Sequence, residues 1–376
     1  MKKKFLGLIL TAVMVMNTAV LTACNQAAEV SDTDSVSWEN SGNDSSDGSG
    51  QEFEQKLEER VRDDSPEHRE LLSDLNFSRG FAVTPFHSNS SGGAKVGYLD
   101  YDGMKADGNA IWTLAQWGCT NNIFEDSEYS REGAVLRYAD AGKKLVVDSS
   151  ETGKITLGIK GSKEYPLDEE GRIPERTDAA ANWPHILIEQ TVNQEIGDVD
   201  NVYMEIEYQV TDCKRLVDEA YGEPNPALNA AQFQWFITLQ DSDEKSESYG
   251  STMWFGFSMF DTRSMNEFPA GTASYDGGKE DSTGLFIYMF SLSQAANLSG
   301  CEVSGVSSVI GETVRIKVDI KKFLRTALKI AAQQGAMKGA SVERLKIGST
   351  NIGWELPGNY DVEVDIHSMN MYTVEK

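Results

Sequence analysis

Residues 231–240, AQFQWFITLQ, alternate apolar and polar side chains with a period of two. Successive side chains of a β-strand point to opposite faces, so this alternation is typical of a strand with one face in a core. The pattern predicts a core face made of Phe233, Trp235, Ile237 and Leu239. The opposite face then carries Gln232, Gln234, Phe236, Thr238 and Gln240.

The same period recurs along most of the chain after residue 80, in runs at 155–159, 202–210, 253–259, 314–320 and 360–366. Turn residues separate the runs, and one helical stretch, 321–334, ends before Gly335. Residues 285–290 are apolar on both faces, which predicts a strand covered on both sides. We therefore expect an all-β fold over residues 80–376: a two-sheet antiparallel sandwich with a few peripheral helices.

The first 24 residues are predicted to be a targeting signal. Three lysines precede an apolar stretch at 5–20, and Leu21-Thr22-Ala23-Cys24 resembles the lipobox of bacterial lipoproteins. That resemblance implies a signal peptide at 1–23, cleavage before Cys24, and a lipid on the Cys24 thiol. The protein would then be held on the extracytoplasmic face of a membrane. Residues 24–50 are rich in Ser, Gly, Asp and Asn, which predicts a flexible tether.

Residues 51–79 are predicted to form a helical strap or stalk. Phe53, Leu57 and Val61 recur every four residues, and Ser65-Pro66-Glu67 is typical of a helix start, here of a helix through Leu75.

Charge and cysteine content exclude some functions. The chain has 34 Lys and Arg against 59 Asp and Glu, a net charge of −25, which argues against nucleic acid and makes polyanionic ligands less suitable. Beyond Cys24, the cysteines Cys119, Cys213 and Cys301 allow either one disulfide with one free thiol or no disulfide. Their spacing does not match a zinc site, so no metal ligand is assigned.

The long alternating runs and the closing segment 360–374, YDVEVDIHSMNMYTV, resemble the concanavalin A-like jelly rolls. This superfamily includes lectins, laminarinase-type glycosidases and alginate-lyase-like enzymes, so the resemblance implies a jelly-roll sandwich that handles carbohydrate. Laminarinase-type enzymes carry Glu-x-Asp-x-Glu or a form one residue longer. Glu363 and Asp365 match its first two positions, but His367 and Ser368 stand where the second glutamate belongs. We therefore leave the catalytic residues unassigned.

Amides and an aromatic ring are the strongest candidates for sugar binding. Gln232 and Gln234 can donate to and accept from sugar hydroxyls. In the run 253–259, Trp254 and Phe260 are predicted to face away from the core, with Trp254 as a platform for a sugar ring. The alternative is an ordinary solvated outer face of the sheet.

Three further places qualify as candidates. His185 and Glu189 share a strand face and could act as acid and base or simply form a structural pair. Arg263 could contact a ligand or pair with Asp261, and we favour the pair. Trp354 lies in a predicted loop at 351–358, where it could contact glycan or anchor the loop to the core.

The function predicted from these features is a membrane-tethered lipoprotein that binds polysaccharide or oligosaccharide at the cell surface. A polysaccharide lyase or glycoside hydrolase on the same fold is an alternative. A structural or adhesive surface protein, or the solute-binding lipoprotein of a transporter, is another. Asp-rich turns at 100–103, 107–109 and 276–281 could hold a structural calcium ion, although ordinary turn chemistry explains them equally well.

Overall fold

The computed structural model describes residues 68–84, 95–99, 110–124, 127–151, 153–223, 225–264, 267–278, 282–305 and 309–375. All of them belong to one compact unit, Ser65–Lys376, which is distinct from a second unit, Met1–Asp64. The predicted signal peptide, Cys24, the tether and most of the strap lie outside the described residues, as do the turns at 100–103 and 107–109. In the part of the chain described here, no helix is long and apolar enough to cross a membrane.

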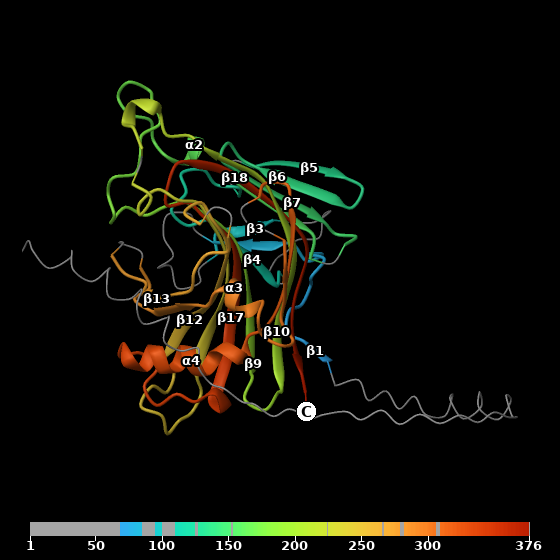
Figure 1. Cartoon of the computed structure of the whole chain (residues 1–376). Coiled ribbons are helices and arrows are strands. Elements are labelled where there is room, and N and C mark those ends of the chain that lie inside the picture. Colours follow the sequence, from blue (N-terminus) through green and yellow to red (C-terminus); the bar gives the residue numbers. More distant parts are fainter. Residues whose placement is uncertain are drawn as a thin grey trace, which may run out of the picture. The chain divides into compact units, whose positions relative to one another are not determined.

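Two β-sheets, each with nine strands among the described residues, form a jelly-roll sandwich (Figure 1). The first, sheet A, has the strand order β15 (Glu302–Ser304), β16 (Thr313–Asp319), β10 (Asn201–Arg215), β18 (Tyr360–Val374), β8 (Ile155–Lys160), β7 (Lys143–Asp148), β6 (Val135–Ala139) and β5 (Glu128–Glu132), with β1 (His68–Glu70) paired to β18. The second, sheet B, has the order β13 (Thr272–Tyr275), β14 (Phe286–Met289), β12 (Thr252–Asp261), β11 (Gln232–Asp241), β17 (Leu345–Glu355), β9 (His185–Glu195), β4 (Trp112–Ala115), β2 (Phe81–Val83) and β3 (Gly97–Leu99).

Most strand pairs are antiparallel, as predicted. Sheet B departs from the prediction in two places, because β12 pairs with β14 and β2 pairs with β4 in parallel. The described helices are short, apart from α4: α2 (Gly161–Glu164), α3 (Leu292–Ala295), α4 (Lys321–Gln333), and the 3₁₀ turns η2 (Glu219–Tyr221) and η3 (Val342–Arg344). Helix α4 occupies the stretch predicted to be helical.

The core lies between the two sheets. Strand β11 contributes its predicted face, and Phe233, Trp235, Ile237 and Leu239 are all buried. Hydrogen bonds also join the sheets: the Tyr208 hydroxyl donates to the Met259 carbonyl, and Trp354 Nε1 donates to the Leu157 carbonyl.

The prediction that Phe260 faces away from the core is wrong. A register shift between Phe233 and Gln234 interrupts the pairing of β11 with β12. A bulge of this kind reverses the alternation beyond it. As a result both Met259 and Phe260 are buried, and the Phe260 ring packs against Trp354 with the ring centroids 5.7 Å apart.

The described part of the predicted helical strap is not helical. Residues 68–70 form β1, which pairs with the C-terminal strand β18, and turns follow. The backbone N–H of Leu71 donates to the Met371 carbonyl, and Leu72 and Phe77 are buried. Packing against the sheet therefore overrides the local helix signal, and the sandwich begins before residue 80.

Candidate functional site

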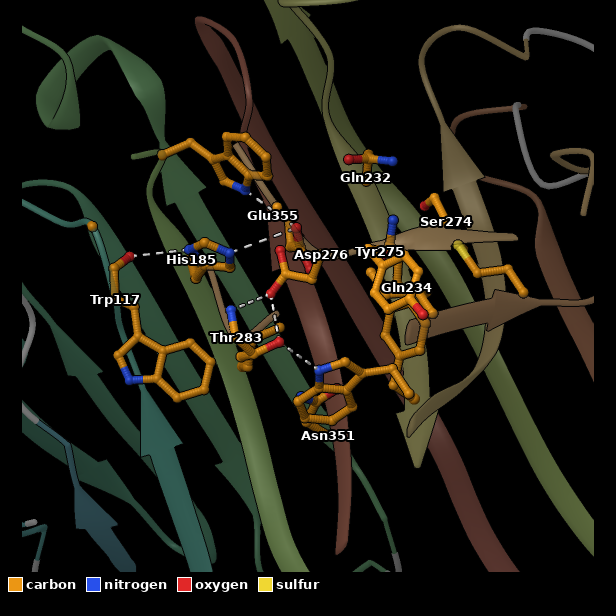
Figure 2. Close-up of a pocket in the computed structure, with 18 of the residues that line it drawn as sticks. Trp117, His185, Gln232, Gln234, Ser274, Tyr275, Asp276, Thr283, Asn351 and Glu355 are labelled. Atoms are coloured by element: carbon orange, nitrogen blue, oxygen red, sulfur yellow. Dashed lines mark hydrogen bonds and ion pairs between the residues drawn. The ribbon is translucent and has the colours of Figure 1, made fainter. Parts of the chain in front are cut away.

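A cavity of about 300 Å³ lies on the face of sheet B that points away from the core. We call this side of the sheet the cavity face. Strands β9, β17, β11, β12, β14 and β13 of sheet B form its floor, and the segments 117–118, 182–183 and 276–277 form its walls. Figure 2 shows side chains of this lining. Its polar lining consists of Asn182, His185, Gln232, Gln234, Thr272, Ser274, Asp276, Thr283, Asn351 and Glu355. Its aromatic and aliphatic lining consists of Trp117, Trp183, Leu187, Phe236, Trp254, Tyr275, Ile287 and Met289.

The strand register explains why these side chains meet. Glu355 on β17 lies directly opposite His185 on β9 and Gln232 on β11. Two residues along, Gly353 lies opposite Leu187 and Gln234, and a further two along, Asn351 lies opposite Glu189 and Phe236. Alternation along each strand thus gathers polar side chains from three distant parts of the sequence on one surface.

Glu355 is held by two neighbours. Trp183 Nε1 donates to Glu355 Oε2 at 3.1 Å, and His185 Nε2 lies 3.6 Å from the same oxygen (Figure 2). His185 Nδ1 lies 3.2 Å from the Trp117 carbonyl, which can only accept, so Nδ1 carries a proton. With the proton of a neutral ring on Nδ1, His185 Nε2 has no hydrogen to donate, so His185 holds Glu355 only as an ion pair, with both ring nitrogens protonated.

The wall at 117–118 is fixed from behind by buried charges. Lys143 Nζ contacts Glu164 at 2.9 Å and Asp140 at 3.0 Å, and all three side chains are inaccessible to solvent. Glu164 accepts the backbone N–H groups of Thr120 and Asn121. A displacement of the loop at 117–121 would break the hydrogen bonds from its backbone to Glu164, a buried carboxylate paired with Lys143. The buried cluster therefore holds the loop that carries Trp117 in place.

The Cys119 thiol also fixes this wall. Burial raises its pKa to about 12, so it stays protonated and donates to the His185 carbonyl at 3.1 Å. Cys119, Cys213 and Cys301 are all free thiols in the structure, which corresponds to the sequence alternative without a disulfide.

Glu189 lies beside the cavity on the same face, next to Asn351. Burial raises the pKa of Glu189 to about 7, and the nearby Lys95, the Asn351 side chain and His185 oppose that rise. Lys95 in turn donates to Thr113 Oγ1 at 3.1 Å, opposite Glu189 on β4. A carboxyl group with this pKa can hold or release a proton near neutral pH.

Trp254 is oriented by two contacts. Its Nε1 donates to Thr283 Oγ1 at 3.4 Å, and Thr283 donates to Asp276 at 2.7 Å (Figure 2). Its ring meets Phe236 edge to face, with the centroids 6.2 Å apart. Since the indole N–H is already bonded, the part of Trp254 offered to a ligand is its ring.

The structure gathers four of the predicted site residues, Gln232, Gln234, Trp254 and His185, in the lining of one cavity. Glu189 lies on the same face beside them. Arg263 is not part of the cavity lining. Its guanidinium forms an ion pair with Asp261, 2.5 Å from Oδ2, and this pair is the alternative that the sequence favoured.

Trp354 is corrected from a candidate ligand to a core residue, since it is fully buried between Phe233 and Phe260. The predicted loop at 351–358 is also wrong up to residue 355, because β17 runs through Glu355. Ile352 and Trp354 point to the core and leave Asn351 and Glu355 on the cavity face. Alternation within NIGWE was the signal that would have identified Glu355.

The acidic residues of the closing strand lie elsewhere, in sheet A. Glu363 forms an ion pair with Lys144, and Asp365 accepts from Thr156. No cluster of three or more His, Cys, Asp or Glu side chains that could hold a metal ion occurs among the described residues. In the described part of the third Asp-rich turn, Asp276 accepts from both the N–H and the hydroxyl of Thr283, seven residues further along the chain.

Comparison with solved structures finds similar folds in glycoside hydrolases. A family 12 xyloglucanase from Bacillus licheniformis is 10% identical, with 67% of this chain and 98% of that chain covered and a TM-score of 0.33. A family 11 xylanase from Neocallimastix patriciarum is 10% identical, with coverages of 67% and 97% and a TM-score of 0.30. The xyloglucanase domain of NopAA from Sinorhizobium fredii, in complex with cellobiose, is 9% identical, with coverages of 66% and 97% and a TM-score of 0.32. No protein-family model and no curated protein sequence matches the chain.

Proposed function

We propose that the protein binds a neutral polysaccharide in the cavity of sheet B. The observation that carries this proposal is the convergence of Gln232, Gln234 and Asn351 with the ring of Trp254 in one cavity. Sugar hydroxyls need directional donors and acceptors, whereas the C–H faces of the rings favour aromatic surfaces. An ordinary solvated sheet face is not expected to be enclosed by walls or to carry an indole ring held in one orientation.

The charge of the cavity favours an uncharged glycan. Glu355 and Asp276 line it, and the described lining contains neither Lys nor Arg. The whole chain adds a net charge of −25. A polymer of uronic acids would meet like charges in this cavity, which disfavours its binding.

Affinity electrophoresis of the full-length chain tests the proposal. Gels that contain xylan, xyloglucan or glucomannan should retard the protein in at least one case, and a gel that contains polygalacturonate should not. Migration that is unchanged in every neutral polysaccharide contradicts the proposed function.

Hydrolysis of the bound glycan is a second candidate function, favoured by two carboxyl groups in different environments on the cavity face. Glu189, with its pKa of about 7, is suited to protonate a leaving oxygen, and Glu355 is suited to activate a water molecule. Retaining enzymes place their two carboxyls about 5 Å apart. The residues directly opposite Glu355 are His185 and Gln232, neither of which is a carboxylic acid.

Glu189 is four residues from His185, or about 13 Å along the strand, so its side chain and that of Glu355 must lean toward each other for catalysis. Inverting enzymes use the larger carboxyl separation, about 6.5–9.5 Å. Any hydrolysis by this pair is therefore expected to invert the anomeric configuration.

Release of reducing ends from a retained polysaccharide measures this activity. Because a general acid must be protonated, the rate should fall as the pH rises through about 7, the pKa of Glu189. Glu189→Gln and Glu355→Gln should each lower the rate by about a hundredfold or more. If the wild-type chain releases nothing, the hydrolytic candidate fails and binding alone remains. If both variants release as much as an active wild type, Glu189 and Glu355 are not the catalytic pair.

We also propose that the protein is anchored in a membrane by lipid on Cys24, as the order of lysines, apolar residues and Leu-Thr-Ala-Cys indicates. Cys24→Ala should release the protein from the membrane fraction or stop its processing. Normal processing together with unchanged membrane association of this variant would refute the anchor.

A further inference from the structure

One end of the cavity is more apolar than a simple sugar site requires. Strand β14 turns Phe286 and Tyr288 toward the core, and its other face presents Ile287 and Met289 to the cavity, where both are only half-buried. The sequence predicted a strand covered by protein on both sides. The structure instead leaves its second apolar face on the cavity, where no strand or helix among the described residues covers it.

The neighbouring strands extend this apolar surface. Ile287 lies directly opposite Trp254, and Met289 lies opposite Gly256. A Cβ at Gly256 would collide with the Trp235 carbonyl oxygen and lie 2.8 Å from the Phe236 ring, so glycine there lets β11 and that ring lie close to β12. Phe236, Trp254, Ile287 and Met289 together form what we call the apolar shelf.

Hydroxyl groups border the shelf on its outer edge. On β13, Ser274 lies directly opposite Ile287 and Thr272 lies opposite Met289, and both hydroxyl residues line the cavity. The opposite end of the same cavity carries His185, Glu355 and Gln232. One ligand therefore meets amides and a carboxylate at one end, and aliphatic side chains bordered by hydroxyl donors at the other.

We propose that the cavity recognises neutral polysaccharides that carry O-acetyl esters, with the acetyl group on the apolar shelf. This inference rests on the proposed function and names its substrate class. The ester methyl would contact Ile287 and Met289, and the ester carbonyl would accept from Ser274 or Thr272. An acetyl group matches these two requirements, because it is a small apolar group that carries one acceptor.

The size and charge of the cavity select this substituent over others. A cavity of about 300 Å³ that must also hold sugar rings has no room for a long acyl chain. A sulfate or carboxyl substituent would be repelled by Asp276, which also lines the cavity. An unsubstituted sugar would stack on Trp254 but leave Ile287 and Met289 in contact with water. The complex would then lack the favourable free energy of burying these two side chains.

The test compares matched polymers. The full-length chain is run in affinity gels that contain xylan or glucomannan, each in its native O-acetylated form and after mild alkaline deacetylation. Burial of one methyl group is worth about fourfold in affinity. The acetylated form should therefore retard the protein with an apparent dissociation constant lower by about fourfold or more.

Three variants locate the effect. The double variant Ile287→Thr, Met289→Gln should bring the two affinities within about twofold of each other, while deacetylated polymer is still bound. The conservative double variant Ile287→Val, Met289→Leu should keep the preference. The matched control is Ile310→Thr, which changes an isoleucine that is 42% exposed and does not line the cavity, and it should also keep the preference.

Each outcome separates this inference from the proposed function. Equal binding of acetylated and deacetylated polymer by wild type, or a preference for the deacetylated form, overturns the inference and leaves polysaccharide binding standing. A preference that survives in the Ile287→Thr, Met289→Gln variant overturns the role of the shelf. Failure to bind any of the four polymers overturns the inference, and it contradicts the proposed function as well if xyloglucan also fails to retard the protein.

Discussion

Replacing Trp235 by alanine is expected to lower the free energy of unfolding by about 3–5 kcal/mol. The side chain is 1% exposed and packs against Phe257, with the ring centroids 6.0 Å apart. Its Nε1 donates to Thr350 Oγ1 at 2.8 Å, and Thr350 is itself buried, so the substitution removes both packing and a buried hydrogen bond. Denaturant unfolding of wild type and variant measures the difference.

Tyr249→Ala is the matched control, because that aromatic side chain is 57% exposed. It should change the free energy of unfolding by less than about 0.5 kcal/mol. A loss below about 1 kcal/mol for Trp235→Ala would place Trp235 at the surface and reverse the register of β11.

Replacing Trp254 by alanine is expected to weaken polysaccharide binding by about ten- to thirtyfold. The ring lies in the cavity, where a stacked sugar would bury it, and aromatic stacking adds to the gain from the buried area. The midpoint of denaturant unfolding should stay nearly unchanged, because Trp254 is only partly buried and contributes little to the core. Affinity electrophoresis in a polysaccharide that retards wild type measures the loss.

Trp254→Phe keeps an aromatic ring and is expected to retain most of the binding. If Trp254→Ala unfolds the domain, Trp254 acts as a core residue. If Trp254→Ala binds as well as wild type, the ring is not part of the binding surface.

Much of the fold could be predicted from the sequence because strand periodicity is a local signal. The core faces of β9 and β11 follow directly from apolar residues at every second position, such as Ile186 and Ile188 in β9 and Phe233 and Trp235 in β11. The burial of Phe260 could not be predicted, since it depends on a bulge in the pairing of two strands. Likewise, β1 became a strand because the C-terminal β18 was available as a partner, whereas the local pattern favoured a helix.

The candidate site was only partly predictable for the same physical reason. Gln232, Gln234 and Trp254 could be predicted because the apolar positions of each strand identify its core face, and therefore also the side chains on the opposite face. Glu355 is not identified in this way, because turn residues on both sides of NIGWE are typical of a loop. Its partners His185 and Trp183 are also about 170 residues away in the sequence. The apolar residues of β14 indicate that both faces of the strand are apolar. Only the tertiary structure shows that Ile287 lines a cavity and is not packed against another part of the protein.

The central claim is that a polysaccharide occupies the cavity of sheet B, and hydrogen–deuterium exchange of the full-length chain tests it most directly. Amide exchange is compared with and without a neutral polysaccharide that retards the protein. Binding in the cavity predicts slower exchange in the wall segments 117–118, 182–183 and 276–277. Slower exchange confined to sheet A, for example to β10 and β18, with these walls unchanged, would contradict the claim.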